Sequence, residues 1–291
     1  MRTTIQSEVF QVTDILLKHA RSAFGDQVKL SDEWQALNYL AEPSYDLAIK
    51  EYDQFTRLVA QLGIVLHYLP SDDSTIDSIY LRDASVLTDR GAILCRMGKA
   101  ARQGEQKTLM RTYRQLGIEV LGEIEAPGKL EGGDTMWLRP DLLAIGRSYR
   151  TNDSGIAQLT SLTANSFEIL SVDLPHHKGP SDVFHLMSVV SPLDTDLLLV
   201  YSPLLTVRFR EWLISNGFHL IELPQEEFES MGINVLTLAP RKCMLLSGNP
   251  NTKKRLVEAG CDVIEFDGYE ISGKGMGGPT CLTRPLWRQY P

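Results

Sequence analysis

The feature that most constrains the fold is a unit of four elements that recurs along the whole chain. Each unit begins with two apolar runs separated by a short break containing Asp, Arg, Pro or Gly, which is the pattern of a β-hairpin. We expect hairpins at residues 9–20, 84–98, 135–146, 188–203 and 234–248. From the second hairpin onward the starts lie about fifty residues apart, a period typical of a propeller-like array.

A helical pattern follows each hairpin, and a short, β-branched apolar run follows each helix. The expected helices cover residues 48–63, 104–117, 154–166, 206–217 and 251–260, and four of these segments end in glycine, the residue favoured just past a helix end. The expected single strands cover residues 63–70, 117–125, 167–175, 217–224 and 260–267.

This repeated order of strand, strand, helix and strand predicts an α/β fold. Its five ββαβ modules would form a five-bladed α/β-propeller with pseudo-fivefold symmetry. No linker separates the units, so we expect one domain over residues 1–291. The alternative is a doubly wound sheet in which the similarity between units is coincidental.

Charge and cysteine content exclude several classes of function. A formal net charge of −8 argues against nucleic acid or an anionic membrane as the main partner, because both require a basic face. No stretch approaches the ~20 apolar residues of a membrane span. The four cysteines, Cys95, Cys243, Cys261 and Cys281, lack CxxC spacing, which predicts free thiols and a cytoplasmic protein. The sequence leaves open whether the chain forms a homodimer.

Chemically reactive side chains gather at the module entrances. DSIYLRDAS carries Asp77 and Asp83 just before the second hairpin, and LEGGDTMW carries Glu131 and Asp134 before the third. FHLMS carries His185 before the fourth hairpin. Singly, these residues would be loop acids and a core histidine. If the modules are equivalent, however, the side chains converge on the axis as acid/base and orienting groups.

A glycine-rich run near the C-terminal end, GKGMGGPTCLTRPLW, carries Cys281. A buried structural cysteine does not need four glycines and a proline around it, whereas a cysteine approached closely by backbone or substrate does. We therefore interpret Cys281 as a nucleophile. A glycine-rich surface turn with an incidental cysteine is the alternative.

Three motifs, LEGGD, FHLMS and GGPTCL, resemble in order the Glu/Asp, His and Cys motifs of the guanidine-modifying (pentein) superfamily. This superfamily contains arginine deiminases, dimethylarginine dimethylaminohydrolases and amidinotransferases, and its fold is a five-bladed ββαβ propeller. The resemblance covers nearly the whole chain and is strongest to the dimethylaminohydrolase branch. SIYLRDASVL is similar to the strand with the guanidinium-binding Asp, ARQGE to a substrate-facing Arg segment and RSYRTN to a carboxylate-binding Arg segment.

The resemblance implies that Asp77, Asp83, Arg102 and Arg150 contact the substrate. Two positions depart from it. Arg82 stands where dimethylaminohydrolases carry an acid, and Met187 stands where deiminases and amidinotransferases place a second guanidinium-binding Asp. We expect Met187 to form an apolar wall that tolerates methyl groups, unless its side chain points into the core.

The chemistry expected of such a site is hydrolysis of a C–N bond in a guanidino amino acid. Asp83 and Asp134 would clamp the guanidinium, and its charge would favour the thiolate of Cys281. His185, oriented by Glu131, would protonate the leaving amine and then activate water against an S-alkylthiouronium on Cys281. The only partner expected is a small guanidino substrate, with no cofactor and no metal.

The favoured product is citrulline plus an amine, as in dimethylarginine dimethylaminohydrolases. The alternatives are an arginine deiminase or dihydrolase that releases ammonia, an amidinotransferase, and a non-catalytic binding module of the same fold.

Overall fold

Five small β-sheets contain the strands of the computed structural model, which describes residues 3–180, 182 and 184–290. Four of the sheets have three strands each. They are β4 (Ser85–Thr88), β5 (Gly91–Leu94) and β6 (Val120–Glu123); β7 (Thr135–Arg139), β8 (Leu142–Arg147) and β9 (Glu168–Asp173); β10 (Val190–Asp194), β11 (Leu197–Val200) and β12 (His219–Glu222); and β13 (Leu236–Ala239), β14 (Lys242–Leu246) and β15 (Asp262–Phe266).

The four three-stranded sheets share one topology, in which the first two strands are antiparallel and the third is parallel to the second. Parallel neighbours need a crossover connection, and a helix supplies it in each unit. These helices are α4 (Gln106–Gln115), α5 (Asp153–Leu162), α6 (Val207–Ser215) and α7 (Pro250–Glu258). The hairpins expected from residue 84 onward, and the helix and strand after each, are therefore confirmed.

The first expected hairpin, at residues 9–20, is wrong. These residues form one strand, β2 (Gln11–Leu17), which runs parallel to β3 (Val65–Tyr68). The antiparallel neighbour of β2 is β16 (Thr283–Gln289), from the other end of the chain, and β1 (Thr3–Thr4) pairs with the far side of β16. Asp14, read as the break in a hairpin, stays within the strand and bonds His67 on β3 at 2.9 Å.

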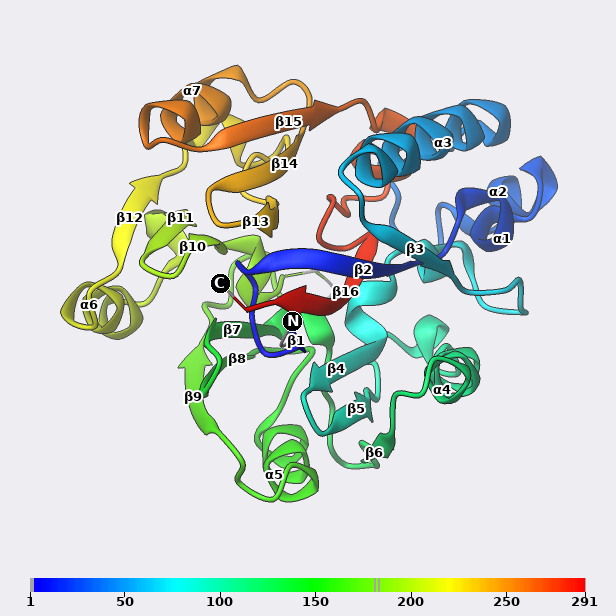
Figure 1. Cartoon of the computed structure of the whole chain (residues 1–291). Helices are drawn as coiled ribbons and strands as arrows, with labels where there is room; N and C mark the ends of the chain where they lie inside the picture. The colour runs from blue at the N-terminus through cyan, green and yellow to red at the C-terminus, as the bar shows by residue number, and fades with distance from the viewer. Residues whose placement is uncertain (1–2, 181, 183, 291) are drawn as a thin grey trace.

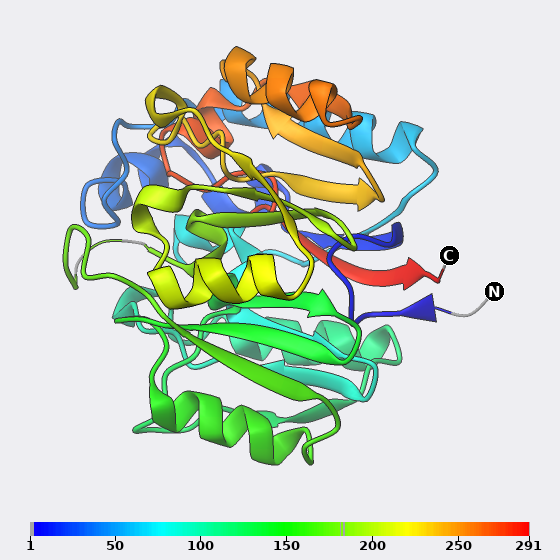
Figure 2. The ribbon, with the colours of Figure 1, turned by 90° about the vertical axis from the view of Figure 1, so that its left-hand side faces the viewer.

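Helices lie at the periphery of the molecule, around the sheets. Figure 1 shows the five sheets about the middle of the molecule, with α4 to α7 outside them and α3 (Tyr45–Gln61) outside β2, β3 and β15. The short helices α1 (Ala20–Phe24) and α2 (Gln27–Glu33) precede α3. Figure 2 shows both termini at the same side of the molecule, where β1 meets β16. None of the helices in the described part of the chain is long and apolar enough to cross a membrane.

Helix α3 illustrates how the sequence pattern becomes packing. Its residues Ala48, Tyr52, Phe55 and Val59 recur at helical spacing and are all buried. The Phe55 ring lies 5.0 Å from the ring of Phe266 at the end of β15, so the helix covers two neighbouring sheets.

The expected glycine helix ends are confirmed. Gly63, Gly117, Gly217 and Gly260 have φ of 78°, 73°, 87° and 83°, the left-handed region in which a side chain is disfavoured. The third helix lacks this glycine and ends through Ala164 and Asn165, whose φ values are 50° and 54°.

Short 3₁₀ turns lie between successive units or before a helix inside a unit, and four expected site residues lie in them, namely Asp77, Asp83, Arg102 and Asp134. The turns are η1 (Ile76–Ile79), η2 (Leu81–Ala84), η3 (Ala100–Arg102), η4 (Gly132–Asp134), η5 (Leu186–Ser188), η6 (Ser202–Leu204) and η7 (Gln225–Glu227); a single π-helical turn, η8 (Tyr269–Gly273), precedes the glycine-rich run.

Candidate active site

Each sheet begins with an antiparallel strand, and a polar side chain stands just before that strand in all five sheets. Asp83 precedes β4, Glu131 and Asp134 precede β7, and His185 precedes β10. Cys281 precedes β16, which occupies this position in the first sheet. The remaining sheet has Asn234 in front of β13, a residue that sequence reasoning missed.

A short hydrogen-bonded chain of buried groups lies at the centre of this arrangement. Nε2 of His185 lies 2.7 Å from Oε2 of Glu131, and Nδ1 of His185 lies 4.0 Å from Oδ1 of Asp83. Oε1 of Glu131 accepts hydrogen bonds from the backbone N–H groups of Gly98 and Lys99. Glu131 is therefore held on one side by backbone and orients the His185 ring on the other.

Electrostatics keep this histidine charged. Burial alone would lower the pKa of His185, but the carboxylates of Asp83, Asp134 and Glu131 outweigh it and raise that pKa to about 9. Burial alone would likewise raise the pKa of Glu131, yet the hydrogen bond to His185 and its charge hold that pKa below the usual value. At neutral pH the pair is an imidazolium and a carboxylate, ready to donate a proton.

Asp83 is positioned as a ligand for a cation. Its Oδ1 accepts the backbone N–H of Gly133 at 3.1 Å, and its Oδ2 accepts Nη1 of Arg102 at 2.6 Å. Burial would raise the pKa of Asp83, but the charges of His185 and Arg102 lower it, so this carboxyl group is ionised.

Asp134 lies elsewhere than expected. Its side chain is fully buried, with Oδ1 accepting the backbone N–H of Leu186 and Oδ2 accepting the hydroxyl of Ser148. It is not among the described residues that line the cavity containing Cys281. Burial raises the pKa of Asp134 to about 6. The geometry therefore places Asp134 behind His185, and does not form the expected clamp of Asp83 with Asp134.

The glycine-rich run passes so close to other groups that side chains would not fit. A Cβ at Gly277 would lie 2.4 Å from Cδ1 of Tyr80, and one at Gly278 would lie 2.5 Å from Cγ of Asn234. This close approach is the physical reason for the glycines around Cys281. The backbone C=O of Cys281 accepts the N–H of Arg82 at 3.3 Å, which joins the cysteine turn to η2.

Asn234 contacts the thiol directly. Its Nδ2 donates to Sγ of Cys281 at 3.3 Å, while its Oδ1 accepts the backbone N–H and the hydroxyl of Thr280. Burial and the charge of Asp83 raise the pKa of Cys281, and the Asn234 hydrogen bond acts in the opposite direction. Its place before β13, equivalent to that of Asp83 before β4, is the sequence signal that could have found it.

Asn234→Asp should lower the thiolate fraction of Cys281. The substitution keeps the oxygen that holds Thr280 but replaces the N–H donor with a negatively charged oxygen. Losing a hydrogen bond to a charged group costs about 1.5–3 kcal/mol, which is a roughly ten- to hundredfold smaller thiolate fraction. The pH dependence of Cys281 alkylation by iodoacetamide, read by mass spectrometry, measures it. Asn251→Asp makes the same change on the surface and serves as control; equal profiles for the two variants would contradict the role of Asn234.

Cys281, His185 and Asp83 line one cavity of about 360 Å³. Asp77 and Arg150, two of the expected substrate contacts, also lie on its wall. Nζ of Lys99 lies 2.6 Å from Oδ2 of Asp77, a pair on the wall that sequence reasoning did not identify.

The two arginines expected to bind substrate differ in how many of their hydrogen-bond donors already have partners. Arg102 lies on the cavity wall, but its guanidinium already bonds Asp83, Glu105 and the backbone C=O of Tyr80. Arg150 has an Nε without a hydrogen-bond partner, 3.7 Å from Oε2 of Glu131. Of the two, Arg150 has the more free donor capacity for a ligand.

The two positions that depart from the family pattern face away from this cavity. Met187 packs in a buried apolar cluster with Leu186 and Phe209, and is not among the described residues of the cavity wall. The expected apolar wall beside the guanidinium is therefore wrong, because the side chain points into the core. Arg82 is buried with Glu8 in a separate cavity, so it does not stand in for an acid in the site.

One group of side chains has the spacing of a metal site among the described residues. Asp83, Glu131 and His185 each offer one ligand atom, all within 4.8 Å of one another. Nε2 of His185 is already bonded to Glu131, and both oxygens of Asp83 accept hydrogen bonds. Each oxygen of Asp83 keeps a second lone pair for a guanidinium, whereas a protonated His185, whose pKa is raised to about 9, has no lone pair to give a metal. The three side chains therefore fit a cation-binding carboxylate and a proton donor better than the ligand shell of a metal ion.

A family model and a curated relative that match this chain carry similar descriptions. A family model described as "N,N dimethylarginine dimethylhydrolase, eukaryotic" matches residues 23–288. An N(G),N(G)-dimethylarginine dimethylaminohydrolase from Pseudomonas aeruginosa is 28% identical over 250 residues, which cover 84% of this chain and 91% of the relative.

Solved structures resemble the whole fold. A Pseudomonas aeruginosa dimethylarginine dimethylaminohydrolase in complex with citrulline matches with a TM-score of 0.76 at 27% identity, over 95% of this chain and all of that one. An amidinotransferase of saxitoxin biosynthesis from Microseira wollei matches with a TM-score of 0.78 over 98% of this chain and 97% of its own. At 14% identity, that second likeness concerns the fold alone.

Proposed function

Because the chain belongs to the N,N-dimethylarginine dimethylhydrolase family, we propose that it hydrolyses a C–N bond in the guanidino group of a methylated arginine, giving citrulline and an amine. The observation that carries the proposal is the cavity shared by Cys281, His185 and Asp83, with Glu131 bonded behind the histidine.

The five units are further proposed to form a five-bladed ββαβ propeller about a pseudo-fivefold axis, as one domain over residues 1–291. The repeated strand order in five sheets and the family match over residues 23–288 support this description. We also propose a small guanidino molecule as the partner and the cytoplasm as the location, because cysteines remain reduced in that compartment and all four cysteines of this chain are free thiols.

The first half of the reaction starts with the substrate's own charge. A guanidinium held by Asp83 lies beside Cys281 and favours its thiolate. The thiolate adds to the guanidinium carbon, and His185 gives its proton to the substituted nitrogen. The bond from carbon to that nitrogen breaks, the amine leaves, and an S-alkylthiouronium remains on Cys281.

The second half restores the enzyme. Neutral His185 takes a proton from water, the oxygen adds to the same carbon, and the C–S bond breaks to return the thiolate. The added oxygen loses its second proton to solvent, so the ureido group of citrulline forms with an oxygen that comes from water. Glu131 keeps the Nδ1 side of His185 turned toward the cavity in both halves, and Asp134 positions the same histidine through the backbone of Leu186.

The proposal is tested by identifying the products. Purified protein incubated singly with dimethylarginine, monomethylarginine and arginine should convert the methylated substrates to citrulline plus the matching methylamine, identified by mass spectrometry. Ammonia and citrulline from arginine, at a kcat/KM above that of every methylated substrate, would instead identify an arginine deiminase. Since Met187 lies in the core, the preference for methylated arginine rests on family membership and not on an apolar wall.

Guanidinium binding should lower the pKa of Cys281. In the free protein burial and Asp83 raise that pKa, so thiolate absorbance in the ultraviolet should rise only at alkaline pH. Millimolar guanidinium chloride should move the rise to lower pH, with equal sodium chloride as control and Cys281→Ser to subtract other groups. An unmoved profile, despite binding seen by calorimetry, would contradict substrate-assisted ionisation.

Arg150→Ala should weaken the use of amino-acid substrates but not of agmatine, which lacks a carboxylate. A planar guanidinium grips a carboxylate bidentately, and losing a hydrogen bond to a charged group lowers affinity roughly ten- to a hundredfold. We expect that loss in kcat/KM for dimethylarginine. Arg147→Ala, an exposed neighbour paired with Asp153, is the control. An equal loss with agmatine would mean that Arg150 acts through Glu131 instead.

A further inference from the structure

Three arginine side chains are buried near the middle of the molecule, away from the substrate cavity. Arg82, Arg284 and Arg288 are 2%, 4% and 1% exposed. Arg82 forms an ion pair with Glu8 at 2.5 Å. The other two arginines have no ion pair with a carboxylate among the described residues. Burying charge without a counter-charge is costly, so this cluster is short of negative charge.

The hydrogen bonds of the cluster are also incomplete. Nη2 of Arg284 donates to the backbone C=O groups of Arg82 and Ser85. The Nε groups of Arg82 and Arg284, however, are buried and have no hydrogen-bond partner. Buried N–H groups nearly always have a hydrogen-bond acceptor. We therefore expect an acceptor that the protein itself does not supply beside the Nε groups of these two cations.

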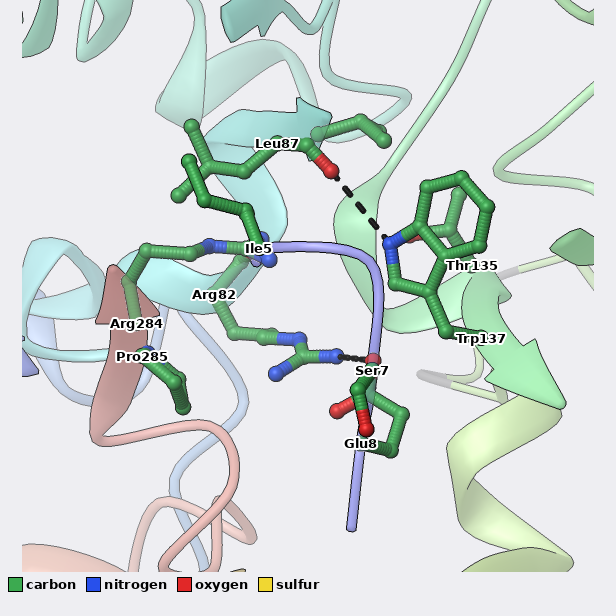
Figure 3. A pocket seen from close by; sticks show the side chains of 10 residues that line it. Ile5, Ser7, Glu8, Arg82, Leu87, Thr135, Trp137, Arg284 and Pro285 are labelled. Atoms are coloured by element: carbon green, nitrogen blue, oxygen red, sulfur yellow. Dashed lines mark hydrogen bonds and ion pairs between the residues drawn. The ribbon is translucent and has the colours of Figure 1, made fainter. Parts of the chain in front are cut away.

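A small cavity lies between these two arginines. Figure 3 shows Arg82 and Arg284 beside the chain segment that carries Ile5, Ser7 and Glu8. Residues of β4, β7 and β16 complete the wall, and the volume is about 10 Å³. That is room for one particle of about the size of a water molecule, and too little for a polyatomic anion. Glu8 is the one acidic residue among the described residues of this wall.

The arginines keep their charge despite the crowding. Burial and the nearby charge of Arg82 lower the pKa of Arg284 to about 10, still well above neutral pH. Both guanidiniums therefore carry positive charge on the wall of this cavity at physiological pH, and the carboxylate of Glu8 is paired with Arg82.

Only a thin backbone layer separates this cavity from the candidate active site. A Cβ at Gly132 would lie 2.6 Å from Nη2 of Arg284, and a Cβ at Gly133 would lie 2.6 Å from Nδ1 of His185. The two glycines of LEGGD thus have the buried arginines on one side and the catalytic groups on the other. Arg82 and Asp83 are likewise adjacent in the chain but belong to opposite sides.

We propose that the cavity between Arg82 and Arg284 is a binding site for a monatomic anion, with chloride as the ligand of suitable size and charge. The anion accepts the unpaired N–H groups and neutralises the buried charge, and it stabilises the fold beneath the active site. It is a structural ligand, separate from the guanidino substrate in both position and sign of charge.

Bromide, which replaces chloride and scatters anomalously, tests the site directly. Crystals grown or soaked in sodium bromide should show an anomalous peak between Arg82 and Arg284. In solution, unfolding is followed at constant ionic strength while chloride replaces gluconate, an anion too large to enter. Above the dissociation constant, each tenfold rise in chloride should raise the folding equilibrium constant by about tenfold. An absence of the peak, or equal stability in chloride and gluconate, overturns the proposal.

Substitutions of Glu8 and Arg284 should change the chloride dependence of stability in opposite directions. Glu8→Gln removes the competing carboxylate, so the chloride dependence should begin at a lower concentration. Arg284→Met should abolish that dependence, while Arg210→Met, which removes a partly exposed arginine on α6, should leave it unchanged. Where Arg284→Met fails to fold, the bromide peak and Glu8→Gln still decide. A weaker chloride dependence in Glu8→Gln contradicts an anion at this place.

Discussion

Replacing Cys281 with serine should abolish turnover while leaving the fold intact. A serine hydroxyl has nearly the size of the thiol, but it stays protonated at neutral pH and is a far weaker nucleophile. Removing a nucleophile typically lowers kcat on the order of 10³- to 10⁶-fold. The measurement is citrulline formation from dimethylarginine, together with a thermal unfolding curve that matches the wild type.

The other cysteines provide matched controls. Cys95, Cys243 and Cys261 are buried in apolar surroundings and none lies on the described wall of the substrate cavity. Their serine variants should turn over substrate wherever they fold. A covalent adduct trapped on one of them, with Cys281 unmodified, would show that the nucleophile has been assigned to the wrong residue.

His185→Gly should separate the two halves of the reaction. Without the imidazole, addition of Cys281 can still proceed with a substrate that has a good leaving group, such as S-methylthiocitrulline. Hydrolysis of the S-alkylthiouronium lacks its base, however, so the covalent intermediate should accumulate. General acid–base catalysis is worth ~10²–10⁴-fold, and turnover should fall by that factor.

Intact-protein mass spectrometry after mixing with substrate measures the intermediate. His176→Gly, an exposed loop histidine bonded to Tyr149, is the control and should show wild-type turnover. Near-wild-type turnover of His185→Gly, or a loss of turnover with no adduct formed from S-methylthiocitrulline, would refute the assigned role in the second step.

Much of the fold follows from local patterns. The hairpins at residues 84–98, 135–146, 188–203 and 234–248 depend on neighbouring residues, and so do the glycines that end four helices. The first sheet could not be read in this way. Its antiparallel pair joins Leu17 to Thr283, and no local pattern reports a partner from the opposite end of the chain.

The residues of the candidate site likewise fall into those that the sequence indicated and one that only the structure identified. Residue type and order indicated Cys281, His185, Glu131 and Asp83 as a group, because their chemistry is distinctive at the module entrances. Asn234 carries no such chemical signal, and its role depends on β16 completing the first sheet so that Cys281 comes to lie beside β13.

Only tertiary packing decided the direction in which each of these side chains points. Asp83 and Asp134 look alike in the sequence, yet one faces the cavity and the other lies behind His185. Met187 turns into the core, and Arg82 faces the opposite side of the chain from Asp83. The chain's composition and periodicity determine which groups are available and which elements form. In a 3₁₀ turn, adjacent side chains point about a third of a circle apart, so which group meets the substrate depends on how neighbouring sheets pack against that turn.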